Sequence, residues 1–167
     1  IMKVLVADND ERVYRAFKDY DPDFEVEFGN PMAYDIDAVV SPANTWGLLD
    51  GGFDASIRRV FGEWGQVNIK KAILERGGIK IGEAIVVKTY HRQISRIVVA
   101  PTMTHLSEKG GDASMAYTVA FSAVVAAKKA GIKKLGMTGL GTGARKLNIH
   151  EAVSYQIEGI EAALKDS

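Results

Sequence analysis

The sequence predicts an α/β fold, a three-layer α/β/α sandwich with a central mixed sheet of about six strands. Apolar runs of strand length alternate with longer segments of helical periodicity along nearly the whole chain. Such alternation is typical of a sheet that is covered by helices on both faces. A chain of 167 residues is long enough to bury a three-layer core, and we expect residues 2–167 to form a single domain.

Composition argues against several classes of function. The 21 basic and 21 acidic side chains cancel, so we expect no membrane-surface or general nucleic-acid binding driven by net positive charge. The chain has no cysteine, which excludes disulfides, thiolate nucleophiles and cysteine metal sites. Its apolar runs are too short for a secretory or membrane-spanning segment, and we expect a soluble, cytoplasmic protein.

The first elements are two strands with a helix between them. Residues 3–7 form an apolar run of strand length, and residues 8–10 supply turn and N-cap chemistry for a helix that follows. Asp8 is interpreted as part of this cap, with ligand contact at the strand end as the alternative. Residues 24–28 alternate apolar and acidic side chains, which indicates a half-buried strand that runs into a turn at residues 29–31.

The next strand ends in a loop suited to phosphate. The apolar run at residues 37–40 stops at 41–42, because a proline cannot donate to a sheet ladder and disfavours helix in the residue before it. Asn44 follows at the carboxyl end of the strand, where open α/β sheets bind ligands. Gly51 and Gly52 then permit a close approach of the backbone, and the amides of the helix that begins after them suit an anion.

Two helical segments follow, at residues 53–61 and 63–76, before the glycine pair at 77–78. Asp54 lies in the first turn of the first segment and has two interpretations. A carboxylate there complements the helix dipole, and it is also a candidate general base. Trp46, in the preceding loop, either lines a ligand site or clamps the loop.

The second half of the chain continues the alternation. Residues 81–87 and 94–100 are predicted to be neighbouring strands. An alanine-rich helix at residues 113–130 and a final strand at 133–138 follow, and a closing helix runs over residues 148–165.

The loop after the final strand is rich in glycine. Gly139, Gly141 and Ala144 formally fit the dinucleotide-binding fingerprint. That fingerprint requires a following strand with an acidic residue at its end, and the sequence after this loop contains only a helix pattern. The glycines are therefore interpreted as a second loop of backbone amides for a diphosphate, with plain turn glycines as the alternative.

Two motifs resemble the signature of the macro domain family. The family pattern NAAN…GGGVDGAI has counterparts in SPAN at residues 41–44 and GGFDASI at residues 51–57. Ser41 and Pro42 replace Asn and Ala, and Asp50 stands where a glycine is usual. An Ala-Pro-Thr-Met run and the late glycine loop are similar to family segments too, so the resemblance extends from about residue 24 to the end of the sequence.

The resemblance implies that the chain binds ADP-ribose, or an ADP-ribosylated macromolecule, with no cofactor and no metal. The scattered histidines, without ligand spacing, also give no reason to expect a metal site. In macro domains the turn after the second strand usually has an Asp that accepts a hydrogen bond from the adenine amino group. Asn30 either accepts that bond through its carbonyl or is an ordinary turn residue. The implied ligand-binding residues are Gly29, Asn30, Ser41, Asn44, Gly51, Gly52, Phe53, Asp54, Thr102, Gly139, Leu140, Gly141, Thr142, Gly143 and Ala144.

The resemblance also implies a possible reaction. In hydrolytic macro domains of this pattern, Asn44 would orient the distal ribose and Asp54 would activate a water near its anomeric carbon. The favoured hypothesis is a hydrolase of ADP-ribosyl linkages on proteins or of ADP-ribose 1″-phosphate. The alternative is a non-catalytic module that reads ADP-ribose or a related nucleotide such as NAD.

Overall fold

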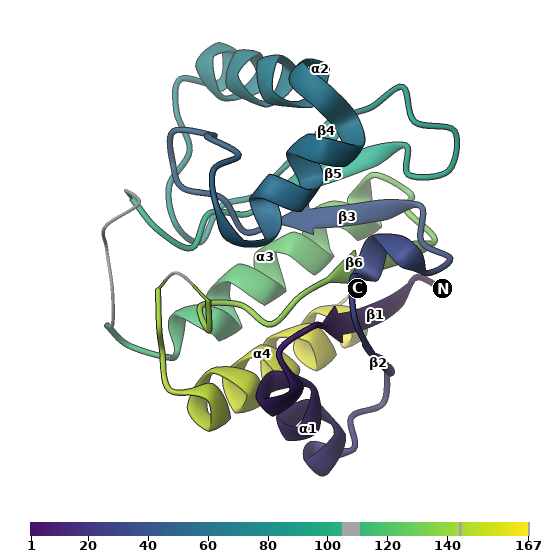
Figure 1. Cartoon of the computed structure of the whole chain (residues 1–167), viewed down its shortest axis with the longest axis vertical. Helices are drawn as coiled ribbons and strands as arrows, with labels where there is room; N and C mark the ends of the chain where they lie inside the picture. The colour runs from purple at the N-terminus through teal and green to yellow at the C-terminus, as the bar shows by residue number, and fades with distance from the viewer. Residues whose placement is uncertain (105–110, 144, 167) are drawn as a thin grey trace.

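The computed structural model describes residues 1–104, 111–143 and 145–166. Within these residues, six strands form one sheet in the order β2-β1-β6-β3-β5-β4. Helices cover both faces of the sheet (Figure 1). The mixed three-layer α/β fold predicted from the sequence is therefore confirmed.

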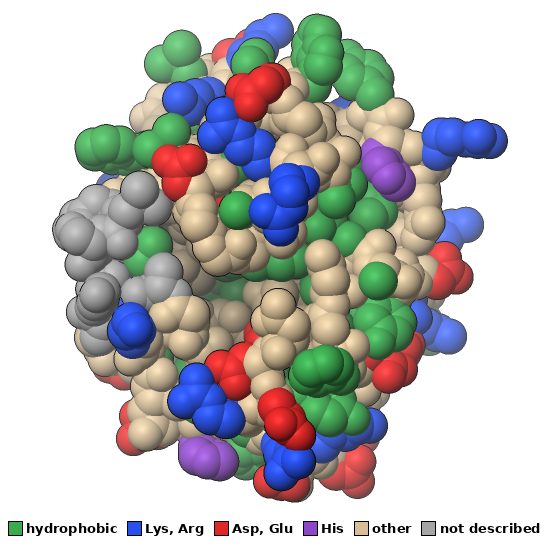
Figure 2. Space-filling model, in the orientation of Figure 1, with side chains coloured by type: hydrophobic (Ala, Val, Ile, Leu, Met, Phe, Trp, Pro, Cys, Tyr) green, Lys and Arg blue, Asp and Glu red, His purple; other side chains and the backbone are tan. Residues whose placement is uncertain are grey.

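The strands are short, and most pair in parallel. They are β1 (Lys3–Asp8), β2 (Glu25–Phe28), β3 (Ala38–Ser41), β4 (Ile85–Lys88), β5 (Arg96–Val99) and β6 (Lys134–Met137). Among the strand pairs in the described residues, only that of β4 with β5 is antiparallel. The carboxyl ends of β2, β1, β6, β3 and β5 therefore meet at one edge of the sheet, and Figure 2 shows a hollow on the molecular face that is viewed with α2 above it and α1 below it.

The helices follow the predicted order closely. They are α1 (Glu11–Tyr20), the short 3₁₀ helix η1 (Pro31–Ala33), α2 (Gly52–Arg76), α3 (Met115–Lys129) and α4 (Ile149–Lys165). The strand predicted from residue 81 begins only at Ile85, because Gly82 adopts a φ of 94° and the chain turns there, with Glu83 N donating to Lys80 O at 3.0 Å. No helix in the described ranges is long and apolar enough to cross a membrane.

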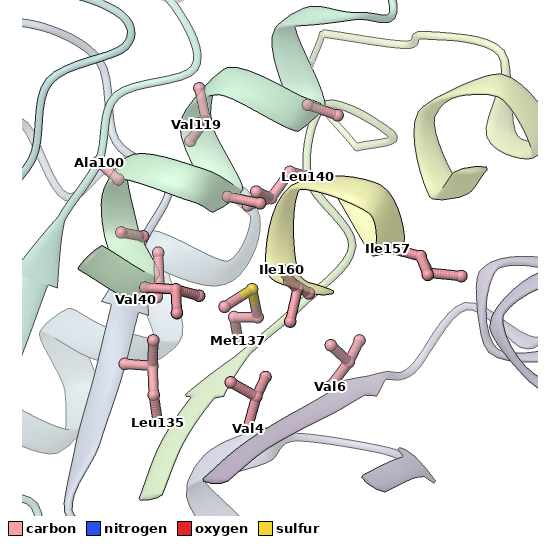
Figure 3. Close-up of a cluster of buried hydrophobic side chains, with 14 of the residues drawn as sticks. Val4, Val6, Val40, Ala100, Val119, Leu135, Met137, Leu140, Ile157 and Ile160 are labelled. Carbon is pink, nitrogen blue, oxygen red and sulfur yellow. The ribbon is translucent and has the colours of Figure 1, made fainter. Parts of the chain in front are cut away.

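Alternating side chains divide the core between the two faces. Val4 and Val6 of β1 pack with α1, α3 and α4, whereas Leu5 and Ala7 pack with α2 on the other face. This alternation follows from the two-residue period of a strand. Figure 3 shows the cluster that contains Val4 and Val6, in which these side chains of β1 and Met137 of β6 lie close to Ile160 of α4.

The long α2 is two helical segments joined at Gly62. This residue has φ 67° and ψ −164°, which is outside helical geometry. A residue with a Cβ rarely adopts such a positive φ, so glycine is required for the kink. The break confirms the two segments predicted on either side of residue 62.

The contact between α3 and α4 requires a glycine. A Cβ built on Gly159 of α4 would lie 2.4 Å from the backbone oxygen of Tyr117. No side-chain movement can relieve a contact with backbone, so we expect Gly159→Ala to reduce the free energy of unfolding by about 1–3 kcal/mol. Helix propensity alone would favour alanine by about 1 kcal/mol, so a net loss in urea denaturation identifies the clash.

Gly143→Ala is the matched control for this variant. A Cβ at Gly143 would meet nothing within 4 Å, so its effect on stability should stay within about 0.5 kcal/mol. Equal effects of the two substitutions would show that the helix contact tolerates a methyl group.

Candidate active site

A cavity of about 470 Å³ opens at the edge where the parallel strands end. It lies in the hollow visible in Figure 2. Its walls come from segments that are far apart in the sequence, so the cavity is a product of the sheet order. The lining residues fall within 8–13, 29–31, 42–59, 102–103 and 138–145.

The N-terminus of α2 presents one set of backbone donors to this cavity. Gly51 is the N-cap, with φ 71°, and no side chain caps the helix there. The first helical hydrogen bond is donated by Ala55 N to Gly51 O at 3.2 Å. The amides of Gly52, Phe53 and Asp54 thus remain without a helical partner, and all three residues line the cavity. Such a helix end attracts an anion.

The glycine loop after β6 presents a second set. Two of its amides are engaged within the protein, since Gly139 N donates to Asp8 Oδ2 at 3.0 Å and Leu140 N donates to Gln156 Oε1 at 2.7 Å. The amides of residues 141–143 donate to no other group in the described part of the chain, and these residues line the cavity. Leu140 lies in the core rather than in the cavity lining, and Ala144 is outside the described residues.

Asp54 combines exposure to the cavity with almost complete burial. Asp54 is only 8% exposed. Burial raises the pKa of its carboxyl group to about 7, and the hydrogen bond from the Ser41 hydroxyl lowers this pKa by a smaller amount. Ser41 Oγ donates to Asp54 Oδ1 at 2.6 Å. Ser41 is itself buried and does not line the cavity. Its hydroxyl therefore binds the carboxylate from within the protein and not from the cavity. A carboxyl group with a pKa near neutrality is suited to accept a proton at physiological pH.

Asn44 lines the cavity but also organises its own loop. Its Oδ1 accepts hydrogen bonds from Trp46 N at 3.0 Å and Leu48 N at 3.3 Å, and its Nδ2 donates to Leu48 O at 3.4 Å. A part in orienting a ribose stays a prediction, because these contacts account for the buried amide. Trp46 itself is 67% exposed and is not part of the cavity lining.

Two arginines line the cavity and were missed by sequence reasoning. Arg145 Nη1 donates to Thr102 O at 2.8 Å, and Arg59 Nη2 donates to Ser56 Oγ at 3.0 Å. Gly52, Ser56 and Arg59 have the i, i+4, i+7 spacing of one helix face. That spacing is the signal by which Arg59 could have been found. Arg145 follows the glycine loop directly, yet nothing local indicates where its side chain points.

The acidic turn after β1 caps α1 as predicted, but the capping residue is Asp10 and not Asp8. The N-cap of α1 is Asp10, whose Oδ1 accepts from Arg12 N at 2.9 Å. Asp8 instead accepts from Asp10 N at 2.9 Å and from Gly139 N, and thus joins β1 to the glycine loop. Burial raises the pKa of the Asp8 carboxyl group. Its partner in the loop follows β6, which is the neighbour of β1 only in the folded sheet.

Asn30 and the histidines complete the predicted set. Asn30 lines the cavity with Gly29, and its Oδ1 accepts from Met32 N at 2.8 Å, as expected for a turn residue that caps η1. His91 Nδ1 accepts from backbone amides in its own turn. Within the described ranges, no group of three or more acidic or histidine side chains has the geometry to hold a metal ion.

Comparison with known families agrees with this architecture. The family model of the Macro domain matches residues 40–156, which is well over half of the chain. The chain belongs to the macro domain family. The match includes both the loop before α2 and the glycine loop after β6.

Individual relatives of this macro domain are distant. An uncharacterized protein of Aquifex aeolicus is 27% identical over 138 residues, which cover 83% of this chain and 81% of that protein. The macrodomain of Mycobacterium tuberculosis DarG has a TM-score of 0.69 at 20% identity, covering 80% of this chain and 87% of that one.

Two structures of Trypanosoma brucei macrodomains contain nucleotides. One, in complex with ADP, has a TM-score of 0.71 at 20% identity and covers 98% of this chain and 57% of that chain. Another, in complex with ADP-ribose, has a TM-score of 0.62 at 22% identity and covers 80% and 56% of the two chains. At these identities the structural likenesses show the fold.

The raised pKa of Asp54 predicts a stability effect. The pKa rises from an ordinary 3.8 to about 7 on folding, so the unfolded chain releases this proton first, and the wild type loses stability as pH rises from about 4 to 7. Asn does not titrate and still accepts from Ser41. Relative to the wild type, the free energy of unfolding of Asp54→Asn should therefore increase between about pH 4 and pH 7. The increase should be on the order of 4 kcal/mol, at about 1.4 kcal/mol per pH unit.

Urea denaturation at pH 4.5 and pH 8 measures this gain. Asp50→Asn, which removes an exposed carboxylate from the same cavity, is the control. It should show a much smaller gain, because the charge of Asp50 is a lesser cause of the raised pKa of Asp54 than burial. A stability difference between Asp54→Asn and the wild type that is constant with pH would contradict the raised pKa.

Proposed function

We propose that this macro domain binds ADP-ribose in the cavity and hydrolyses the bond between its distal ribose and the group attached there. One observation carries the proposal: two sets of backbone amides, which donate to no group in the described part of the chain, share a cavity with a buried carboxylate whose pKa is about 7. The attached group is a modified protein side chain or a phosphate, as in ADP-ribose 1″-phosphate.

Binding rests on the amides at the start of α2 and in residues 141–143. Backbone N–H groups can wrap a diphosphate without any net positive charge on the protein. Arg59 and Arg145 line the same cavity and add positive charge to it. The Trypanosoma brucei macrodomains that hold ADP and ADP-ribose share this fold, which supports the choice of ligand by analogy.

Hydrolysis rests on Asp54. Its ionised carboxylate would take a proton from a water that attacks the anomeric carbon of the distal ribose. A C–O bond forms from this water, the bond to the attached group breaks, and the proton passes to the leaving group. Ser41 Oγ, at 2.6 Å from Oδ1, holds the carboxylate in one orientation, so the second oxygen is available to the water.

Because the glycine loop is proposed to bind the diphosphate, we expect Gly141→Val to lose affinity for ADP-ribose while it remains folded. Gly141 has φ 78°, and a Cβ there would lie 2.5 Å from Leu147 Cδ1. The loop must shift, and its amides with it, so affinity for ADP-ribose should fall at least about tenfold, or roughly 1.4 kcal/mol. Isothermal titration calorimetry measures both affinities, and thermal unfolding checks that the variant is folded.

Gly131→Val is the matched control for binding. Gly131 also has a positive φ, of 74°, but a Cβ there meets nothing within 4 Å, and the residue is not part of the cavity lining. Its affinity should equal that of the wild type. Absence of heat and of any thermal shift in the wild type at millimolar ADP-ribose would refute the binding proposal.

Catalysis by Asp54 predicts a distinct rate profile. Because the base must be ionised, kcat/KM should rise with pH, with a midpoint near the pKa of about 7, and level off above it. Asp54→Asn should lower the rate by about 10²-fold or more while ADP-ribose still binds within a few-fold. The assay measures ADP-ribose released from Glu-, Asp-, Ser- and Arg-linked proteins and phosphate released from ADP-ribose 1″-phosphate.

Three outcomes separate the hypotheses. Asp50→Asn should retain the rate and move the midpoint to lower pH, because the charge of Asp50 contributes to the raised pKa of Asp54. A wild type that binds ADP-ribose but releases nothing from these substrates is a reader of ADP-ribose. An active wild type whose rate is unaffected by Asp54→Asn uses another base.

A further inference from the structure

The sheet order gives the cavity a direction. Its lining segments follow strands in the order β2, β1, β6, β3 and β5, at about 4.8 Å per strand. One end therefore contains residues 29–31 and 8–13, the middle contains the glycine loop, and the other end contains Asp54 and Thr102. The whole row spans about 19 Å, which is four such spacings.

The order of the lining segments indicates where each half of the ligand lies. This placement rests on the proposed function. With the distal ribose beside Asp54 and the diphosphate at residues 141–143, the nucleoside half extends over β1 and β2. Val13 and Pro31 supply apolar surface at that end of the cavity. The nucleobase then lies within reach of Asn30, which follows β2.

The amide of Asn30 has a determined orientation. Its Oδ1 accepts from Met32 N at 2.8 Å, and a flipped amide would bring two donors together, so the oxygen faces the turn. Asn30 is exposed and lines the cavity. Its Nδ2 donates to no group in the described part of the chain. Asn30 therefore offers a hydrogen-bond donor to the nucleobase.

The carboxylates at this end of the cavity already bind groups of the protein. Both oxygens of Asp8 already accept from backbone amides, those of Asp10 and Gly139. Asp10 Oδ1 accepts from the backbone and Nε of Arg12, and its Oδ2 accepts from Arg12 Nη2 at 2.8 Å. An exocyclic amino group that approaches Asn30 would thus meet its Nδ2 donor, while Asp8 and Asp10 already accept from protein donors.

We propose that Asn30 determines base specificity, and that the site accepts a 6-oxopurine nucleotide at least as well as an adenine nucleotide. A purine with an oxygen at position 6 presents an acceptor to Nδ2, whereas adenine presents a donor there. Two donors that face each other cannot form a hydrogen bond, and leaving them unpaired weakens binding. A donor that faces an acceptor forms the bond and avoids this loss. The substrate class is then purine diphosphate ribose, and adenine is not selected.

Asn30→Asp provides the direct test. Asp is an equally good cap for η1, so the fold is retained, and its second oxygen offers an acceptor in place of Nδ2. Calorimetry with ADP-ribose and with its hypoxanthine analogue gives two dissociation constants for each protein. The wild type should bind the analogue at least as tightly as ADP-ribose, and Asn30→Asp should shift the ratio about tenfold or more toward ADP-ribose.

Asn9→Asp is the matched control, because Asn9 lines the same end of the cavity and the substitution adds the same charge. Its ratio should equal that of the wild type. A wild-type preference for ADP-ribose of tenfold or more overturns the inference, as does a ratio that Asn30→Asp leaves unchanged or that Asn9→Asp shifts equally. In those cases ADP-ribose still binds and the proposed function survives; if neither nucleotide binds, both fall.

Discussion

The parallel pairing of β2, β1, β6, β3 and β5 is the constraint on which the cavity depends. Parallel strands deliver all their carboxyl ends to one edge, and each loop that leaves this edge contributes to the same site. Hydrogen bonds between loops then hold the rim together. Asp8 receives the amide of Gly139, Arg145 donates to Thr102 O, and Thr102 Oγ1 donates to Pro42 O at 3.0 Å. Local geometry alone would not align these loops.

In the glycine loop, some backbone amides bind groups of the protein and others belong to residues that line the cavity. Gly139 and Leu140 donate to side chains from β1 and α4, and Gln156 of α4 is fully buried. Leu147 N donates to Gly141 O at 2.8 Å and Lys146 N donates to Gly143 O at 3.1 Å, so contacts within the protein also hold residues 141–143. Such preorganisation lowers the entropy lost on binding. The proposed anion site therefore does not require net positive charge on the chain.

Asp54 distinguishes a structural from a functional account of the start of α2. A carboxylate that only complemented the helix dipole would be stabilised in its charged form, and its pKa would fall. Burial instead raises the pKa of Asp54 to about 7, against the stabilising hydrogen bond from Ser41. Desolvation is therefore the larger effect. A buried carboxyl group that costs stability and lies on a cavity is a candidate for function, which supports the hydrolase proposal over the reader.

The sequence by itself determined the order of strands and helices, the break at Gly62, and the two glycine loops. Each of these depends on neighbouring residues: an apolar period, a proline, or a glycine that permits a positive φ. The tertiary structure decided which groups within the loops remain available. Asp8 and Gly139 are 131 residues apart in sequence, and Ser41 meets Asp54 only when α2 packs beside β3. Strand order and burial arise from contacts between distant segments, so spacing along the chain could not reveal them.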